Sequence, residues 1–319
     1  MNKMLRLMPL AAALLLAGCV NLAPTYERPA SPIEEVWPQD GEAYAVSEMK
    51  RASLPRWQDF ICDERLKTVI EEGLKNNRSL RQAALNVELA RAQYGVQRSE
   101  LFPTVAAVAQ ETAQRTPETT SALGESSTTH TYTAQLAMTS YEIDFFGRIR
   151  NLNEQALQAY LQSEDAHRTA QSSLIAEIAM AWLTLGADRA QLALQKETLA
   201  SQEETYKLME ESFKAGAASR LDLEQARTTV TAARAAIASY VRAVAQDKNA
   251  LDLLVGKSVD EKLLPTGLEL NATLPASLPE GLPSEVLFNR PDIWSAERGM
   301  LSANAQIGAA RAAFFPSFS

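Results

Sequence analysis

The chain has 319 residues, of which 46% are hydrophobic and 22% charged, a composition that excludes a disordered or collagen-like protein. Its 31 basic and 39 acidic residues give a net charge of −8, which argues against a nucleic acid as a partner. Two cysteines and two histidines are too few for a disulfide framework or a cysteine-based zinc site. We therefore expect neither metal chemistry nor a cofactor.

Residues 1–18 have the features of a signal peptide. Lys3 and Arg6 form a short positive region, and the apolar stretch that follows is too short for a bilayer, which needs roughly 20 residues. Leu16-Ala17-Gly18 then precedes Cys19, which is similar to the lipobox of bacterial lipoproteins. We expect cleavage before Cys19, acylation of Cys19 and, because residue 20 is Val, sorting to the outer membrane. The alternative is an ordinary secretory signal peptide.

Residues 19–62 form a lead segment that is rich in proline between Pro24 and Pro55, so we expect extended chain there. Near its end, Cys62 is expected to act as a small apolar residue in a packed segment. Residues 63–102 are rich in Ala, Leu, Arg and Gln and predict one helix, which Pro103 ends.

Residues 103–144 predict a β-hairpin with arms at 104–115 and 131–143, separated by a tract rich in Ser and Thr. In the second arm, apolar residues alternate with polar ones; the apolar set is Tyr132, Ala134, Leu136 and Met138. This alternation is typical of a barrel strand with lipid on one side and water on the other, and each arm reaches the roughly 9–11 residues that such a strand needs. A soluble hairpin fits the same pattern.

Residues 145–256 predict a long helical hairpin, because no proline interrupts them and apolar residues recur every seven positions. The first series is Ile178, Leu185, Leu192, Leu199, Tyr206 and Phe213, and the second is Leu223, Val230, Ile237, Val244 and Leu251. Three positions after each member of the second series stand Ala226, Ala233, Tyr240, Asp247 and Leu254. Asp247 is the one polar interruption of this coiled-coil seam. A helix over 148–213 would be roughly 100 Å long, which no compact domain contains.

Residues 257–285 are proline-rich and predict an extended connector, whereas 286–319 repeat an earlier part of the chain. Shifting the sequence by 213 positions aligns 76–103 with 289–316 without a gap, with nine identities in 28 positions. The second copy stops three residues after Pro316, where the first copy begins its hairpin. We therefore expect that this chain lacks the rest of a second repeat.

Several motifs follow one another in a characteristic order after the lipobox and the proline-rich lead. They are Asn76–Leu80, Phe102-Pro103, Glu142–Arg148, Gly216–Asp222, Asn289–Ile293 and Ala309–Pro316. In this order and spacing the chain resembles the outer membrane factor family of the TolC-like superfamily. Within that family it is most similar to OprM-type outer membrane lipoproteins of resistance-nodulation-division (RND) multidrug efflux pumps.

The resemblance implies a mixed membrane protein that is mostly α. Long antiparallel coiled-coil helices would form part of a trimeric periplasmic α-barrel, and the β-hairpin would contribute to a trimeric outer-membrane β-barrel. It further implies a homotrimer, anchored through acylated Cys19 in the outer membrane of a Gram-negative bacterium and extending into the periplasm. As the passive exit duct of a tripartite pump, it would work with a periplasmic adaptor protein and an inner-membrane RND transporter.

The resemblance also assigns roles to particular residues. Those that would contact the adaptor at the tip of the helical hairpin are Gly216, Ala217, Ser219, Leu221 and Asp222. From the residues alone, the same segment is equally a plain turn, in which Gly216 adopts a left-handed conformation and Ser219 caps the next helix. Residues with structural roles at the junctions of strands and helices would be Phe102, Pro103, Asp144, Phe146, Gly147, Arg148, Phe315 and Pro316.

Three other functions fit the sequence less well. The strongest is a lipid-anchored coiled-coil lipoprotein that spaces the envelope without a pore, although such a spacer needs no alternating strands. A periplasmic adaptor fits less well, because β-rich lipoyl halves would flank its helical hairpin, whereas 63–101 and 286–313 predict helix. An enzyme is the weakest, because the sequence contains neither a glycine-rich phosphate loop nor a recognisable Cys-His or Ser-His-Asp arrangement.

Overall fold

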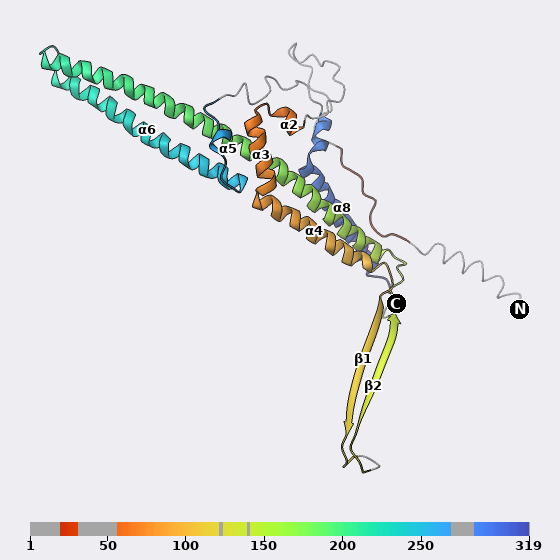
Figure 1. Ribbon diagram of the computed structural model, residues 1–319. Helices are drawn as coiled ribbons and strands as arrows, with labels where there is room; N and C mark the ends of the chain where they lie inside the picture. The colour runs from red at the N-terminus through yellow and green to blue at the C-terminus, as the bar shows by residue number, and fades with distance from the viewer. Residues whose placement is uncertain (1–19, 31–55, 121–123, 139–140, 269–283, 319) are drawn as a thin grey trace. The chain divides into compact units, whose positions relative to one another are not determined.

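Figure 1 shows the computed structural model of the chain, which describes residues 20–30, 56–120, 124–138, 141–268 and 284–318. The expected signal peptide and Cys19 lie outside the described residues, as do parts of the lead and of the connector. The chain divides into two compact units. Of the described residues, the first takes in those within 20–30, 86–164 and 294–318, and the second takes in those within 56–85 and 165–293.

The described residues are mostly helical, with one pair of strands. In chain order the elements are α2 (Trp57–Phe60), α3 (Glu64–Asn76), α4 (Arg78–Ser99), β1 (Val105–Thr116), β2 (Ser127–Met138), α5 (Arg148–Lys214), α6 (Arg220–Val255), η1 (Glu261–Leu263), η2 (Ser284–Asn289) and α8 (Pro291–Ala312).

The stretch 63–102, expected as one helix, is two helices. α3 ends because Asn77 has an extended backbone, with φ −61° and ψ 128°. The Asn77 side chain then accepts a hydrogen bond from the backbone N–H of Leu80 at 2.8 Å, which caps the start of α4. Helix propensity is similar on both sides of the break, so this side-chain cap is what divides the stretch.

The core of the second unit lies where α3 packs on α5 and α6. Leu66, Val69 and Ile70 share one face of α3 and are fully buried. They belong to a cluster with Trp182, whose indole N–H donates to the Leu263 carbonyl at 3.0 Å. Cys62 was expected to be packed but is exposed, and its neighbour Ile61 takes the buried position instead.

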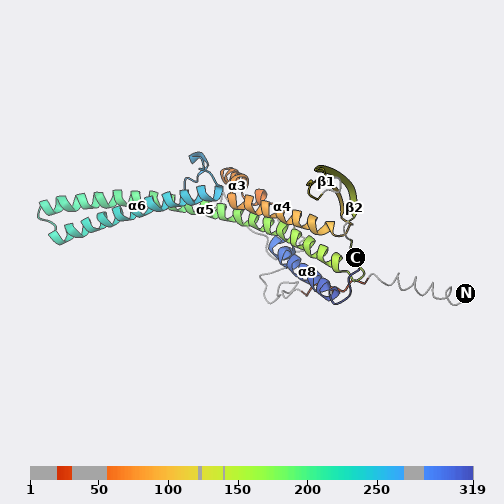
Figure 2. The same cartoon turned by 90° about the horizontal axis from the view of Figure 1, so that it is seen from below.

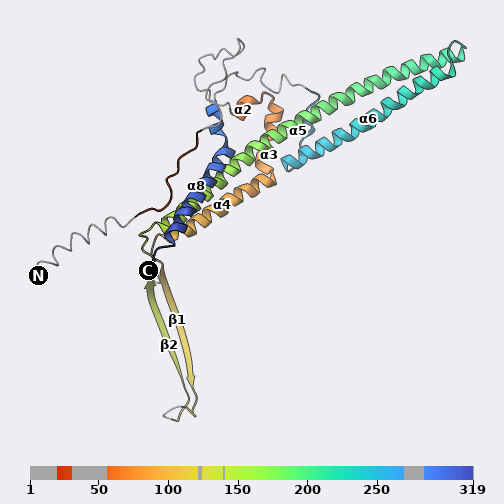
Figure 3. The ribbon, with the colours of Figure 1, turned by 180° about the vertical axis from the view of Figure 1, so that it is seen from behind.

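α5 and α6 form an antiparallel hairpin and lie side by side in Figures 2 and 3. Of the predicted seam, Ile178, Leu185, Val230 and Leu251 are buried, and most of the other members are half-buried. Towards the tip the seam residues are only half-buried, and Phe213 is 39% exposed. Burial therefore varies along the seam, because Val230 is buried while Ile237 and Val244, nearer the base of the hairpin, are half-buried.

In the first unit, β1 and β2 pair antiparallel, from Val105 opposite Met138 to Thr116 opposite Ser127. The second strand begins and ends a few residues earlier than the arm predicted over 131–143. The register confirms the predicted alternation, because Leu136 lies opposite Ala107 on one face and Gln135 lies opposite Val108 on the other.

The helical part of the first unit is built around the beginning of α5, with α4 and α8 on either side of it (Figure 2). The rings of Tyr94 on α4 and Tyr160 on α5 stack with their centroids 6.2 Å apart. From α8, the hydroxyl of Ser302 donates to the carbonyl of Gln155 at 3.2 Å. These contacts join α4 and α8 to the beginning of α5.

Candidate functional site

The tip of the helical hairpin is a tight turn between the end of α5 at Lys214 and the start of α6 at Arg220. Gly216 has a φ of 75°, so the predicted left-handed turn is confirmed. The backbone N–H of Ala217 donates to the Ser212 carbonyl at 2.8 Å and satisfies one of the carbonyls that the end of α5 leaves free. A Cβ at Gly216 would meet nothing within 4 Å, so glycine is favoured here by the backbone conformation and not by a lack of space.

Ser219 caps α6, as predicted, through a reciprocal capping box with Asp222. The Ser219 hydroxyl accepts from the Asp222 backbone N–H at 3.2 Å, and the Ser219 backbone N–H donates to the Asp222 carboxylate at 3.1 Å. The Ser219 hydroxyl also donates to the Asp222 carboxylate at 2.7 Å. This hydrogen bond and, after it, the one from the Ser219 backbone N–H lower the pKa of Asp222 because they favour its charged form. The tip is thus a rigid turn with an ionised carboxylate at its surface.

A shallow groove runs between α5 and α6 beside this turn. Its lining is Gln202, Thr205, Met209, Ser212, Ala217, Ala218, Asp222, Gln225, Ala226 and Thr229. Of the five tip residues named from the sequence, Ala217 and Asp222 line the groove, while Leu221 is 67% exposed. Small and polar side chains at such a surface allow another helix to come close.

A second cluster lies where the strand hairpin joins α5. Gly147 has a φ of 77°, and Arg148 pairs with Glu142 across this turn. Asp144 accepts from the backbone N–H of Arg150 at 3.0 Å, which satisfies an amide in the first turn of α5. The ring of Phe146 stacks on Phe315 with the centroids 4.5 Å apart.

The structure therefore brings some of the predicted junction residues together and leaves others apart. The backbone of Ile143 bridges to Phe318, so the chain that follows Pro316 pairs beside the entry to α5. Phe102 does not share this packing; it is 61% exposed, and Pro103 is exposed as well. The two Phe-Pro motifs are equivalent in sequence but not in their surroundings.

The segment 20–30 docks on the helical part of the same unit, a feature that the sequence analysis missed. The backbone N–H of Val20 donates to the Phe145 carbonyl at 3.1 Å, and the Asn304 amide donates to the Pro24 carbonyl at 2.8 Å. Arg28 pairs with Glu297 of α8. A glycine in the interior of a predicted helix can indicate that another part of the backbone packs closely against it. Gly308 of α8 is the residue in the sequence that could have indicated this docking.

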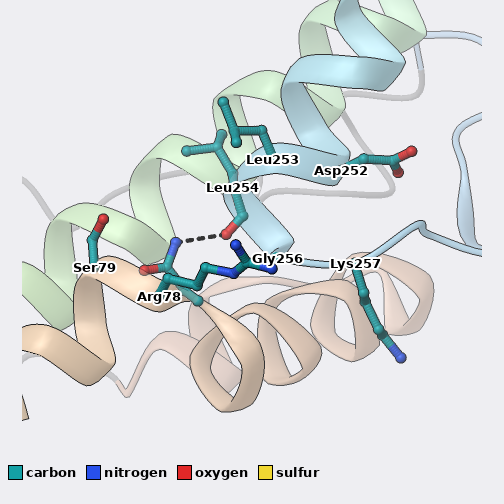
Figure 4. Close-up of a pocket in the computed structure, with 8 residues that line it drawn as sticks. Arg78, Ser79, Asp252, Leu253, Leu254, Gly256 and Lys257 are labelled. Atoms are coloured by element: carbon teal, nitrogen blue, oxygen red, sulfur yellow. Dashed lines mark hydrogen bonds between the residues drawn. The ribbon is translucent and has the colours of Figure 1, made fainter.

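Asn77 joins two helix ends, because its amide donates to the Leu254 carbonyl at the end of α6 over 2.7 Å. Figure 4 shows Leu254 and Gly256 at this end of the helix. Gly256 ends α6 with a φ of 82°, and a Cβ there would lie 2.6 Å from the Asn76 carbonyl oxygen. The surrounding hollow is lined by Asn77, Arg78, Ser79, Asp252, Leu253, Leu254, Gly256 and Lys257. An Asn directly after an α-helical segment was the sequence signal for this cap.

Among the helices that the structure describes, none combines the length and the apolar character needed to cross a membrane. Within the same residues, no three His, Cys, Asp or Glu side chains gather into a group that could hold a metal ion.

Comparison with known proteins shows which family shares this architecture. Residues 69–257, more than half of the chain, match the model of the family described as outer membrane efflux protein. The probable efflux pump outer membrane protein TtgC of Pseudomonas putida is 46% identical over 96% of this chain and 63% of its own length. Outer membrane protein OprJ of Pseudomonas aeruginosa is 40% identical over 97% of this chain and 64% of its own length.

A solved structure of an outer membrane channel has a fold similar to that of this chain. The open state of the Neisseria gonorrhoeae MtrE outer membrane channel superposes with a TM-score of 0.74 at 37% identity, covering 93% of this chain and 64% of that one. The chain thus spans less than two thirds of the length of these proteins. Its matched region includes both the strand hairpin and the helical hairpin, and the chain belongs to the outer membrane efflux protein family.

Proposed function

We propose that this chain forms part of the outer membrane channel of a tripartite multidrug efflux pump, a passive exit duct across the periplasm and the outer membrane. The observation that carries the proposal is the family match over 69–257, which takes in β1, β2, α5 and α6 together. Relatives of this chain are named as efflux pump outer membrane proteins. A duct needs a water-lined path and no catalytic group.

The strand hairpin supplies the part that crosses the outer membrane, within a β-barrel shared by three copies. One face of the pair carries Val105, Ala107 and Ala109 opposite Met138, Leu136 and Ala134. The other face carries Gln110 and Thr112 opposite Thr133 and Thr131. Each strand has 12 residues, more than the roughly 9–11 that cross the hydrocarbon region. The apolar part of the first face fits contact with lipid, and the polar part of the second face fits the lumen. The first face also carries Glu111 and His130, and the second also carries Ala106 and Val108.

The helical hairpin over 145–256 supplies part of the periplasmic tunnel. Besides the seam that joins α5 to α6, α5 carries Met180, Leu194 and Leu208, which are all more than half exposed. They stand 14 residues apart, two heptads, and so share one face of the helix. Packing against helices of neighbouring copies would remove this apolar surface from water, which supports a homotrimer.

Cys19 supplies the lipid anchor. It is covalently bonded to Val20, whose N–H is held by the Phe145 carbonyl at the base of the strand hairpin. Acyl chains on Cys19 would therefore enter the membrane beside the strands, and they contribute roughly 0.8 kcal/mol per buried methylene. Labelling with radioactive palmitate should mark this chain and leave a Cys19→Ala variant unmarked.

The hairpin tip is where a periplasmic adaptor, itself joined to an inner-membrane RND transporter, would dock. The contact residues are Gly216, Ala217, Ser219, Leu221 and Asp222. In an assembled pump, Ala217→Cys should crosslink to cysteines at the tip of the adaptor. The matched control is Ala250→Cys, an exposed alanine on α6 near the other end of the hairpin. Equal crosslinking at the two positions would contradict the assignment.

Single-channel conductance in planar bilayers tests the duct itself. The chain would be compared with a version extended by the remaining C-terminal part of TtgC. Conductance steps from the extended protein support the proposal. Silence from both, with each protein folded and lipid-anchored, would favour an envelope spacer without a pore.

A further inference from the structure

α4 and α8 are equivalent helices of the internal repeat, but they contact α5 through different faces. On α4, the ring of Tyr94 stacks on Tyr160 of α5 with the centroids 6.2 Å apart. On α8, the hydroxyl of Ser302 donates to the Gln155 carbonyl of α5 at 3.2 Å. Tyr94 and Leu89, the α4 equivalent of Ser302, are five positions apart, so they lie about 140° from each other around the helix. The beginning of α5 therefore lies between two different faces of one repeat unit (Figure 2).

The exposure of equivalent positions is inverted between the two helices. Face A is the side of Tyr94, and it is half-buried on α4 but exposed on α8. Its positions are Val87, Ala90 and Tyr94 on α4, which correspond to Met300, Ala303 and Ile307 on α8. Face B is the side of Leu89, and it is exposed on α4 but buried or half-buried on α8. Its positions are Leu89, Ala92 and Val96 on α4, which correspond to Ser302, Ala305 and Ala309 on α8. Each helix thus has one covered face and one open face.

Both open faces carry large apolar side chains at the spacing of a coiled coil. On face B of α4, Leu89 and Val96 are 58% and 70% exposed. On face A of α8, Met300 and Ile307 are 52% and 45% exposed. The members of each pair stand seven residues apart, so they lie on one side of their helix. Packing of another helix on each stripe would remove this apolar surface from water.

Gly95, next to Val96 on α4, fits the close approach of another helix. Its repeat equivalent is Gly308 of α8, where a Cβ would lie 2.6 Å from the Asn151 side chain of α5. A Cβ at Gly95 would instead meet nothing within 4 Å. Glycine weakens the interior of a helix, and a close contact from outside the described residues would account for its presence here.

We propose that each open face binds a long helix of the same kind as α5. Face A of α8 binds the long helix that the repeat predicts after α8 in the same chain, in the way that face A of α4 binds α5. Face B of α4 binds that helix from a neighbouring copy, in the way that face B of α8 binds α5. The inference rests on the proposed function as a homotrimeric duct, and it names the surface through which the copies meet. Because different surfaces of the two copies meet, the contact is head-to-tail and can close into a ring.

The polarity of α5 favours this occupant of α4 over α5 of another copy. Gln158 of α5 is only 7% exposed, and its side-chain oxygen accepts from Arg298 of α8 at 3.2 Å. The α4 equivalent of Arg298 is Leu85, which has no donor to offer. Face B of α4 placed on α5 would therefore leave the buried Gln158 oxygen without this partner, which costs stability. The apolar stripe of α4 needs a helix with an apolar row instead.

Labelling of single cysteines with a maleimide tests both contacts without disturbing them. The test positions are Val96→Cys and Met300→Cys, and the matched control is Gln93→Cys, since Gln93 and its equivalent Gln306 are both exposed. All three are made in a Cys62→Ser background, because Cys62 is exposed and would react. In the chain itself, all three cysteines should react. In the trimer of the version extended by the remaining C-terminal part of TtgC, Val96→Cys and Met300→Cys should be protected and Gln93→Cys should not.

Dissociation of that trimer by dilution separates the contact between copies from the contact within one chain. We expect Val96→Cys to become reactive in the monomer and Met300→Cys to stay protected. Reaction of Val96→Cys in the trimer at the rate of Gln93→Cys would overturn the proposal, and so would protection that persists in the monomer.

A charge on face B of α4 tests the proposed surface separately from the duct. Val96→Glu and Leu89→Glu in the extended protein would bury an unpaired carboxylate at the contact, so sedimentation should show a loss of trimer. Gln93→Glu should leave the trimer intact. Trimers that persist in all three variants would overturn the proposed surface while leaving the duct unaffected. A trimer that Val96→Glu disrupts, but that shows no conductance when unaltered, would support the surface and contradict the duct.

Discussion

The side-chain amide of Asn151 donates to the side-chain oxygen of Asn21 over 2.8 Å and so joins two residues that lie 130 positions apart in the chain. Gly308 of α8 makes room for this pair, because a Cβ there would lie 2.6 Å from Asn151 Nδ2 and 2.7 Å from Ala23 Cβ. The docking of segment 20–30 therefore depends on a glycine in a helix interior.

Gly308→Ala should release this segment from α8. We expect faster amide exchange at Val20, whose N–H is bonded to Phe145, and a loss of about 1–3 kcal/mol in the free energy of unfolding, as is usual for overpacking. Gly95 is the matched control, because it is the repeat equivalent of Gly308 but has nothing within 4 Å of a Cβ. Gly95→Ala should stabilise the protein by about 0.5–1 kcal/mol, the usual gain in a helix. Unchanged exchange at Val20 in Gly308→Ala would contradict this account.

Gly256→Ala should be more damaging than a typical glycine substitution. The backbone conformation, with a φ of 82°, costs a residue with a side chain about 1–3 kcal/mol, and the new Cβ would meet the Asn76 carbonyl oxygen at 2.6 Å. Gly267→Ala provides the comparison, because its nearest contact, the Ala190 Cβ, lies at 4.0 Å. Chemical denaturation measures the free energy of unfolding of both variants. Equal values would contradict this account, because they would mean that the ends of α3 and α6 move apart at little cost to admit the new Cβ.

The start of α6 should fray in acid. The Ser219 hydrogen bonds hold the pKa of Asp222 below its unfolded value, so their contribution is present above about pH 4 and is lost as the pH falls through the folded pKa. Amide exchange in the first turn of α6, corrected for intrinsic rates, should report this loss. Asp222→Asn should remove the pH dependence, whereas a dependence that survives in that variant would assign it to another group.

Ser219→Ala should weaken the same helix start at all pH values. Loss of a serine N-cap costs about 1 kcal/mol, because the Asp222 backbone N–H loses its partner. Ser212→Ala, a change of the same size on the other side of the turn, is the control and should leave the first turn of α6 as it is. The measurement is amide exchange at residue 222, and equal protection in both variants would be evidence against the cap.

Phe146 and Phe315 should be energetically coupled. A double-mutant cycle of Phe146→Leu and Phe315→Leu should give a coupling free energy of about 0.5–1.5 kcal/mol, the range for stacked aromatic pairs. A cycle of Phe102→Leu with Phe315→Leu should give none, since Phe102 is exposed and does not stack on Phe315. An equal coupling free energy in the two cycles would mean that the stacking of the two rings does not cause the coupling.

Local signals predicted the elements well, because heptad spacing, strand alternation and capping residues act over a few positions. α5 runs from Arg148 to Lys214, against an expectation of 148–213, and Gly216 and Ser219 have the predicted conformations. The prediction was wrong where one side chain decided the outcome. Asn77 divided an expected single helix, because a cap formed with its own side chain competes with helix continuation.

The two hairpins, their faces and the internal repeat can be read from the sequence alone, since each is a periodic pattern of neighbouring residues. The surroundings of equivalent positions of the repeat depend instead on the tertiary packing. Gly95 lies open and Gly308 is covered, and Phe102 is exposed whereas Phe315 stacks on Phe146. These relationships join residues far apart in the chain, so they depend on which segments pack together and leave no periodic trace in the sequence.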